Sequence, residues 1–264
     1  MEHALVVALG GVVAKVHLAR TDVASLRDRL GFAARSPVFV PPTTPEPLRG
    51  PDASAVTLWP RVEVLDPDRV PPWEEAARLL AALHRTPPTA DLPTHGGHDR
   101  LLRAAHRLAV APDSPAVAVL RRTAQAVVEA SGRRADPPAP MAVVHGDWHL
   151  GQLGRFGAAT DGSPWRLLDI DDLGLGDPAW DLARPAGFWA AGLLDDESWS
   201  TFLGAYRATG GTAVPAAGDP WPALDPPARA AVLVAATRAV LRPDTLSQDT
   251  AEALVAACER MQDW

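Results

Sequence analysis

The densest cluster of potential catalytic side chains in this 264-residue chain is HGDWHLGQ, at residues 145–152. A second polar segment, LDIDD, follows at residues 168–172. Short apolar runs at 141–144 and 165–170 accompany the two segments, and we expect both runs to be buried strands. With the polar loop between them they should form one hairpin, which would bring the polar groups together where the strands end.

The residue types in these segments suit phosphoryl transfer. Asp147 can orient an attacking hydroxyl and accept its proton. Gln152 and Asp169 offer a neutral and an anionic oxygen, which are ligands that Mg²⁺ prefers. Asp171 is either a second metal ligand or a hydrogen-bond partner of the loop, because it lies on the same strand face as Asp169. Asp172 is expected to be solvated.

Three motifs in register resemble the aminoglycoside phosphotransferase and choline kinase superfamily, which has a protein-kinase-like fold. The family's catalytic loop reads His-Gly-Asp, four residues, then Asn, and Gln152 stands at the Asn position here. LDID at 168–171 resembles the family's metal-binding segment, and GDPAWDLA at 176–183 resembles its Gly-Asp-Pro-x-x-Asp-Leu-Ala signature. HLGQ at 149–152 is similar to the variant of maltokinases and glucosamine kinases, which favours a sugar as acceptor.

The resemblance also implies a nucleotide site in the N-terminal part. Lys15, in the run VVAKV at 12–16, is similar to the strand lysine that binds the α- and β-phosphates in kinase-like folds. The run around Trp59 and Arg61 is similar to the inter-lobe strand whose backbone meets the adenine. We therefore expect Lys15, Trp59 and Arg61 to bind ATP, with Mg²⁺ as the second cofactor.

Other motif residues are expected to support the site rather than react. His145 and His149 resemble loop histidines that hold the backbone by hydrogen bonds. Asp181 resembles a buried acid that fastens the catalytic loop, and Asp177 precedes Pro178 in the pattern of a helix start. The sites implied in total are the base Asp147, the metal ligands Gln152, Asp169 and Asp171, and the supports His145, His149, Asp177 and Asp181.

The rest of the pattern predicts an α+β, two-lobed fold. Apolar runs at 4–9 and 12–18, separated by Gly10 and Gly11, predict a tight hairpin. A further strand is expected over 55–64, with Pro60 at an edge or a bend. Residues 1–64 should form a small, shortened antiparallel N-lobe and 65–264 a mainly helical C-lobe. Helices are predicted at 21–34, 73–84, 99–110, 114–131, 199–209, 226–241 and 248–261.

The N-terminal part departs from the family pattern in two ways. Only 14 residues precede Lys15, so no glycine-rich phosphate loop is visible. Either the natural start lies upstream of Met1 or the phosphate site is open on that side. The predicted helix at 21–34 also lacks the Glu that pairs with the lysine in kinases, and Asp28 is the candidate substitute.

Composition excludes several classes of protein. The net charge of -7 and the pI near 5.6 argue against a nucleic-acid or anionic-membrane partner. Cys258 is the only cysteine, which excludes an intramolecular disulfide and a zinc site of several thiolates. The first residues lack a signal-peptide pattern, and no run approaches the ~20 apolar residues of a membrane span. We expect a cytoplasmic protein, of undetermined oligomeric state.

Three functions are weighed. The first is an ATP- and Mg²⁺-dependent phosphotransferase acting on a hydroxyl of a sugar, an aminosugar or an aminoglycoside-like acceptor. The second is a non-catalytic kinase-like protein that binds a ligand or a partner through a degenerate nucleotide site. The third is a zinc hydrolase with ligands among His145, Asp147, His149 and Asp169.

No motif identifies the acceptor. Four aromatic residues near the proposed cleft are expected to pack in the protein interior, namely Trp148, Trp180, Phe188 and Trp189. The acids at 195–197 are expected to be solvated or to start a helix.

Overall fold

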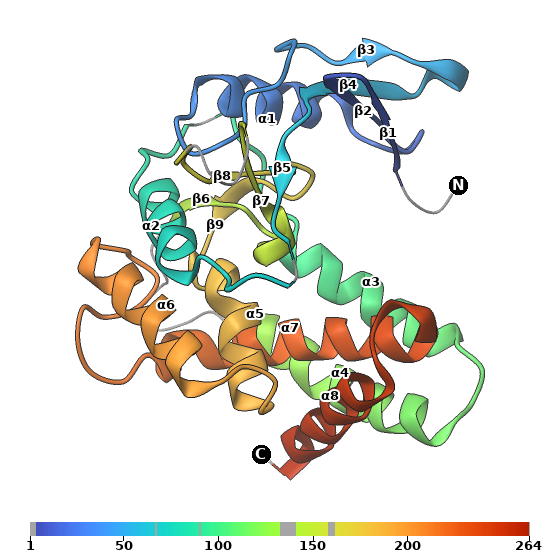
Figure 1. Cartoon of the computed structure of the whole chain (residues 1–264). Helices are drawn as coiled ribbons and strands as arrows, with labels where there is room; N and C mark the ends of the chain where they lie inside the picture. The colour runs from blue at the N-terminus through green and yellow to red at the C-terminus, as the bar shows by residue number, and fades with distance from the viewer. Residues whose placement is uncertain (1–3, 67, 90, 133–140, 158–161, 264) are drawn as a thin grey trace.

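The computed structural model describes residues 4–66, 68–89, 91–132, 141–157 and 162–263. The N-terminal part is an antiparallel sheet with strand order β1-β2-β4-β3 (Figure 1). Its strands are β1 (Leu5–Leu9), β2 (Val12–Val16), β3 (Leu48–Arg49) and β4 (Ala55–Pro60). The hairpin expected at Gly10 is present, and the φ of +58° at this residue suits a glycine in a tight turn.

Helix α1 (Val23–Arg35) follows the hairpin, close to the predicted bounds. Asp22 caps it, because its carboxylate accepts a hydrogen bond of 3.1 Å from the Ala24 amide. Leu26 and Leu30 are buried and join the main core. The helix therefore packs the N-terminal part onto the rest of the molecule.

The single strand predicted over 55–64 is in fact two strands in two sheets. β4 ends at Pro60, and β5 (Glu63–Val64) pairs with β7 (Leu153–Arg155), which pairs in turn with β8 (Arg166–Leu167). Proline has no amide to donate, so a ladder ends readily at this residue. The chain thus passes from one sheet to the other between residues 60 and 63. The lobe boundary at residue 64 stays a prediction.

The predicted hairpin between 141–144 and 165–170 is wrong. β6 (Ala142–Val144) pairs with β9 (Gly174–Gly176), and β8 pairs with β7. A Cβ on Gly174 would lie 2.3 Å from the Pro93 carbonyl oxygen, so the close passage of the segment 93–95 requires glycine there. Glycine weakens the strand pattern in the sequence, which is why β9 was not predicted.

Among the described residues, seven α-helices follow β5. They lie beside and below this region in the view of Figure 1. They are α2 (Trp73–His84), α3 (Gly97–Val110), α4 (Pro115–Gly132), α5 (Ala179–Ala190), α6 (Asp196–Ala208), α7 (Trp221–Leu241) and α8 (Gln248–Arg260). α5 was predicted only as a helix start. α7 begins before the predicted Pro226 and continues through Pro227, because its largely buried, apolar surface outweighs the lost backbone bonds.

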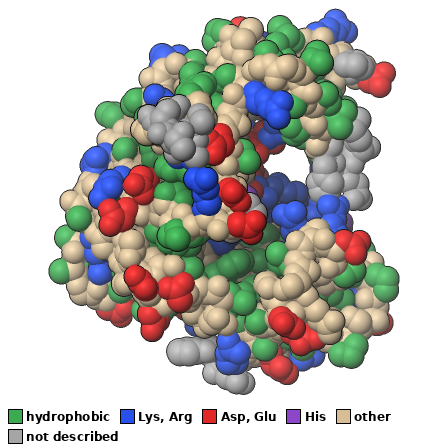
Figure 2. All heavy atoms as spheres, viewed as in Figure 1, with side chains coloured by type: hydrophobic (Ala, Val, Ile, Leu, Met, Phe, Trp, Pro, Cys, Tyr) green, Lys and Arg blue, Asp and Glu red, His purple; other side chains and the backbone are tan. Residues whose placement is uncertain are grey.

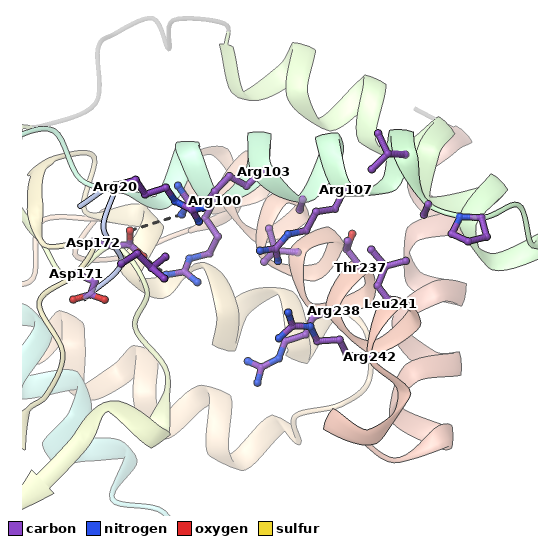
Figure 3. A pocket seen from close by; sticks show the side chains of 16 residues that line it. Arg20, Arg100, Arg103, Arg107, Asp171, Asp172, Thr237, Arg238, Leu241 and Arg242 are labelled. Atoms are coloured by element: carbon purple, nitrogen blue, oxygen red, sulfur yellow. Dashed lines mark hydrogen bonds and ion pairs between the residues drawn. The ribbon is translucent and has the colours of Figure 1, made fainter. Parts of the chain in front are cut away.

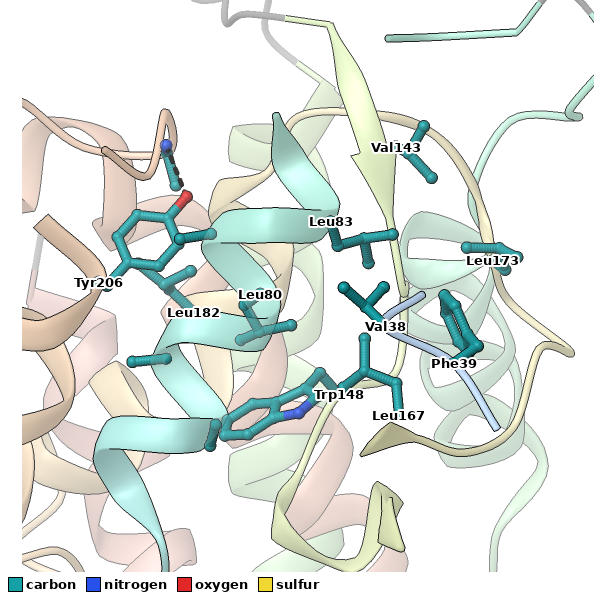
Figure 4. Packing of buried hydrophobic residues seen from close by; sticks show 14 of the residues in the cluster. Val38, Phe39, Leu80, Leu83, Val143, Trp148, Leu167, Leu173, Leu182 and Tyr206 are labelled. Carbon is teal, nitrogen blue, oxygen red and sulfur yellow. Dashed lines mark hydrogen bonds between the residues drawn. The ribbon is translucent and has the colours of Figure 1, made fainter. Parts of the chain in front are cut away.

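The core places the polar loop after β6 against the helices (Figure 4). Leu80 and Leu83 of α2 pack in one cluster with Trp148 of that loop and with Leu182 of α5. Cys258 is fully buried on α8, and burial raises the pKa of its thiol to about 12. Within the described residues, no helix is long and apolar enough to cross a membrane.

Candidate active site

A buried carboxylate on α5 holds the loop that follows β6. One Asp181 oxygen accepts hydrogen bonds from the His145 amide, at 2.7 Å, and from His84 Nε2, at 2.9 Å. The other accepts a bond of 2.9 Å from the Gly146 amide. The burial of Asp181 opposes ionisation, but the His84 contact and these bonds lower its pKa overall. An ionised Asp181 therefore anchors the loop that carries Asp147.

Each of the two loop histidines makes a hydrogen bond to a backbone group. His145 Nε2 donates to the Leu168 carbonyl oxygen at 2.7 Å, which ties the loop to the segment that carries Asp169. His149 Nδ1 accepts a bond of 3.0 Å from the Gly151 amide, and burial lowers the pKa of His149 to about 3, so this ring is neutral at ordinary pH. Asp177 accepts a bond of 2.9 Å from the Ala179 amide at the start of α5.

Backbone geometry at two positions brings the loop and the acidic segment together. Gly146 has a φ of +84°, and a Cβ there would lie 2.3 Å from the Asp172 carbonyl oxygen. Asp169 has a φ of +58°, which is uncommon for a residue with a side chain. Such strained residues cluster at functional sites.

Lys15 reaches across from β2 to the acidic segment. Its Nζ lies 2.7 Å from an Asp169 oxygen and 2.9 Å from an Asp171 oxygen. Burial disfavours both charges, but the ammonium outweighs burial and lowers the pKa of Asp169. Burial and the Asp169 charge raise the pKa of Asp171. Lys15 thus pairs with the acidic segment and not with Asp28, the candidate partner considered from the sequence. α1 instead contributes Arg29, whose Nε donates to the Leu173 carbonyl oxygen at 2.7 Å.

Two arginines contact Asp147. Arg100 of α3 lies 2.8 Å and Arg184 of α5 lies 3.5 Å from its oxygens. Burial raises the pKa of Asp147, and the two guanidinium groups oppose that rise. The carboxylate is thus partly desolvated yet held by cations from two helices.

Asp172 is not solvated as predicted. Arg100 donates a hydrogen bond to its carboxylate, Arg103 lies 4.0 Å away, and the side chain is only 12% exposed. Its backbone carbonyl accepts from the Gly96 amide at 2.9 Å. The prediction failed because a run of acids usually faces solvent, whereas α3 brings arginines to this one.

Two cavities meet at these residues. An apolar cavity of about 330 Å³ is lined by Trp59 of β4, by Lys15 and by Asp169 and Asp171, among others. A more polar cavity of about 310 Å³ is lined by residues of the loop, of β2 and of α3, namely Lys15, Arg100, His145, Asp147, Asp169, Asp171 and Asp172, besides Ala4 and Val6. The structure thus brings Lys15, Asp147, Asp169 and Asp171 to one place.

Two of the residues predicted to bind the nucleotide or the metal lie off these cavities. Arg61 is exposed, and its backbone amide donates a hydrogen bond of 2.8 Å to the Gly11 carbonyl oxygen. Gln152 lines neither cavity, although its carbonyl accepts a bond of 2.8 Å from the Leu168 amide, next to Asp169. Their assigned roles stay predictions.

The donor atoms suit a magnesium ion that also binds phosphate oxygens. Asp169 and Asp171 are carboxylates that face each other across Lys15, and Asp171 Oδ1 is buried without a hydrogen-bond partner among the described residues. An orphaned buried carboxylate oxygen is a natural position for a cation. Among the residues that the structure describes, no three His, Cys, Asp or Glu side chains are grouped so that they could hold a metal ion. The zinc hydrolase considered from the sequence therefore has no set of ligands among these residues.

Sequence reasoning missed Arg100 and Arg184, the two arginines on Asp147. Arg184 follows the anchor Asp181 by three residues, a spacing that places both on one side of α5. Arg100, Arg103 and Arg107 recur at helical spacing on α3. These spacings were visible in the sequence, but only contact with the loop distinguishes them from a solvated helix face.

The aromatic residues near the loop pack as predicted, and Trp148 and Phe188 also line one cavity. Trp148 is 3% exposed and stacks on Phe202 at a ring distance of 5.4 Å. Trp189 stacks on Trp199 and on Trp221, each at 5.8 Å. Phe188 lines a small cavity of about 310 Å³ beside His149 and Arg184.

Several solved structures share the fold of this chain at low sequence identity. A choline/ethanolamine kinase family protein from Mesorhizobium loti is 16% identical, with a TM-score of 0.63, over 100% of this chain and 86% of that one. Choline kinase from Streptococcus pneumoniae is 13% identical, with a TM-score of 0.64, over 100% and 90%. A spectinomycin phosphotransferase, in complex with ADP and spectinomycin, is 11% identical, with a TM-score of 0.58, over 100% and 91%. These likenesses establish the kinase-like, two-lobed fold.

The sequence comparisons identify the family. No curated protein matches the chain significantly. The model of the phosphotransferase enzyme family matches residues 19–226, which include the loop with Asp147, the segment with Asp169 and the anchor Asp181. The match spans well over half of the chain, and the folds compared are those of small-molecule kinases. The chain therefore belongs to the phosphotransferase enzyme family.

Proposed function

We propose that this protein is an ATP- and Mg²⁺-dependent phosphotransferase that acts on a hydroxyl group of a small molecule. The observation that carries the proposal is the convergence of Lys15, Asp147, Asp169 and Asp171 on one cavity. A sugar, an aminosugar or an aminoglycoside-like compound was the acceptor expected from the sequence. The spectinomycin phosphotransferase of similar fold was solved with a nucleotide, which supports the choice of a nucleotide donor.

The base and the phosphates of a nucleotide would each have a matching surface. The apolar cavity beside Trp59 suits the base, and Lys15 lies where that cavity meets the polar one, so it suits the phosphates. Asp169 and Asp171, with Gln152 in the loop, would hold Mg²⁺. When bound, this ion would neutralise charge on the phosphate oxygens. Lys15 would then exchange its carboxylate partners for phosphate oxygens.

Asp147 would act as the base. As the acceptor hydroxyl oxygen bonds to the γ-phosphorus, the bond from that phosphorus to the bridging oxygen breaks, ADP leaves, and the hydroxyl proton passes to Asp147. Arg100 and Arg184 would orient the carboxylate through their contacts at 2.8 and 3.5 Å. Asp181 keeps the loop in place through the His145 and Gly146 amides.

The first test is calorimetric titration with ATP and Mg²⁺. The wild-type protein should bind saturably, and Asp169→Asn should lose at least tenfold in affinity, since one anionic metal ligand becomes neutral. The control is Asp113→Asn, an exposed acid in a surface ion pair, which should bind like wild type. Equal magnesium-dependent affinity in wild type and Asp169→Asn would contradict the assignment of Asp169.

The pH dependence of turnover tests the base. Asp147 must be ionised to accept a proton, and burial raises its pKa, so kcat should fall as pH drops through a value above the ordinary ~3.9 of aspartate. Arg184→Gln removes a cation that opposes the rise, so the acid limb should move to higher pH. An acid limb unchanged in Arg184→Gln would argue against Asp147 as the titrating group.

One observation favours a second candidate, a non-catalytic protein that binds a ligand or partner. Within residues 4–16, β1 and β2 are joined by the tight turn at Gly10, and no glycine-rich loop covers the polar cavity there. The same titration separates the two candidates. The absence of binding at millimolar ATP and Mg²⁺ would favour the non-catalytic protein.

A further inference from the structure

A large cavity opens beside the acidic segment, between α3 and α7. Its volume is about 840 Å³, and its apolar floor includes Ala104, Val234 and Leu241. The arginines that line it come from three parts of the chain: Arg20 after β2, Arg100, Arg103 and Arg107 on α3, and Arg238 on α7 with Arg242 just after its end. In the space-filling view, basic side chains gather along the hollow of the molecule (Figure 2).

The cavity is cationic although the protein is acidic. Six arginines and only two acids, Asp171 and Asp172, line it, whereas the whole chain has a net charge of -7. Both acids belong to the segment beside the candidate active site, and Arg100 binds Asp172. Farther along α3 and α7, the charged residues that line the cavity are thus all arginines.

The arginines form two facing rows (Figure 3). Arg100, Arg103 and Arg107 are spaced i, i+3 and i+7, which places them on one face of α3 over about 10 Å. Arg238 on α7 and Arg242, the residue just after the end of this helix, point into the same space. Because Arg100 also contacts Asp147 at 2.8 Å, the α3 row begins at the proposed base and leads away from it.

Three of these guanidinium groups have no partner within the protein. In the part of the chain that the structure describes, no ion pair or hydrogen bond involves the side chains of Arg20, Arg107 or Arg238. Exposed arginines on a helix are often merely solvated. Here, however, exposed side chains of like charge from three segments line one cavity with apolar residues on its wall, and an anion between them would relieve the repulsion that solvent leaves unscreened.

We propose that this cavity binds the acceptor and that the acceptor is a hydroxylated small-molecule anion, with phosphate or carboxylate groups. The inference rests on the proposed function, because it requires the acceptor hydroxyl to lie at Asp147. Guanidinium forks bind both kinds of oxyanion in a bidentate manner. The hydroxyl would lie near Arg100, and the anionic group several bonds away, between Arg107 and Arg238.

The same charges disfavour cationic acceptors. Polycations such as aminoglycosides need carboxylates along their binding surface, and the charged residues beyond Asp171 and Asp172 in this cavity are arginines. The acids at 195–197 lie elsewhere: Asp195 caps α6 through the Ser198 amide at 2.7 Å, and Asp196 accepts from Trp189 Nε1 at 2.7 Å. The volume of about 840 Å³ suits a ligand of sugar-phosphate size or larger.

The test uses four probes with the same six-carbon skeleton: glucose 6-phosphate, gluconate, glucose and glucosamine. Titration calorimetry of the intact protein, without nucleotide, should show binding of at least one of the two anions and much weaker binding of the neutral and cationic sugars. Which anion binds distinguishes phosphate from carboxylate recognition. The double variant Arg107→Ala/Arg238→Ala should lose roughly 10- to 100-fold in affinity for that anion.

A charge-matched control separates the cavity from general electrostatics. Arg27→Ala/Arg78→Ala also removes two positive charges, from exposed side chains on α1 and α2, and should bind like wild type. Binding of neither anion, or equal binding by wild type and the cavity variant, would overturn the proposal. Titration with ATP and Mg²⁺ reports on the proposed function separately. A protein that binds the nucleotide through Asp169 but neither anion would remain a kinase with a different acceptor.

Discussion

Asp147→Asn is expected to lower kcat by about 10²- to 10⁴-fold, the range that a positioned general base contributes. Asparagine keeps the shape of the side chain and can still contact the guanidinium groups of Arg100 and Arg184, but it cannot accept the hydroxyl proton. The nucleotide contacts proposed for Lys15 and Asp169 are unaltered. The affinity for ATP and Mg²⁺ should therefore stay within a few fold of wild type, and the loss should appear in turnover at saturating substrate.

Two measurements make this result specific to the base. Thermal unfolding should show that Asp147→Asn is folded, and Asp113→Asn, at an exposed position just before α4, should keep full turnover. Turnover of Asp147→Asn within about threefold of wild type would show that Asp147 does not act as the general base, because that role contributes at least about 10²-fold.

Asp181→Ala is expected to have the largest effect on stability, at about 3–5 kcal/mol of unfolding free energy. The side chain is fully buried and accepts three hydrogen bonds, from the His145 and Gly146 amides and from His84. Its removal leaves these donors buried and unpaired, which is more costly than losing the bonds alone. The midpoint of thermal unfolding should fall by roughly 10 °C.

Asp177→Ala is the matched control for this variant. Asp177 makes one bond, to the Ala179 amide, so its loss should cost about 1 kcal/mol. The pKa of Asp181 is lower in the folded protein, so its contribution is complete above the unfolded pKa and disappears as pH falls through the folded one. The difference in unfolding free energy between wild type and Asp181→Ala should therefore become smaller at acidic pH. Equal stability of the two alanine variants would contradict the anchoring role.

Local patterns in the sequence were sufficient for several elements. Apolar spacing predicted α1, α2 and α8 close to their observed bounds, because each has a clear helical stripe or cap. The hairpin at Gly10 was also predicted, from two apolar runs separated by glycines. The loop at 145–152 and the segment at 168–172 were located through their residue types and order, since the chemistry of phosphoryl transfer restricts which side chains can serve.

The partners of the short strands could not be predicted from local sequence patterns. The strands predicted at 141–144 and 165–170 are present as β6 and as the shorter β8, but they pair with β9 and β7 and not with each other. Short strands carry no information about which neighbour they will join, and β9 is glycine-rich because another segment passes close to it.

The electrostatics of the site depend entirely on long-range contacts. Lys15 meets Asp169 across 154 positions of sequence, and Arg100 meets Asp172 across 72. Local sequence therefore specified which side chains are available, through periodicity, capping and motif chemistry. The folded chain specified which charges face one another, including the arginine rows of α3 and α7, because Coulomb interactions depend on distances that only the packing of distant elements sets.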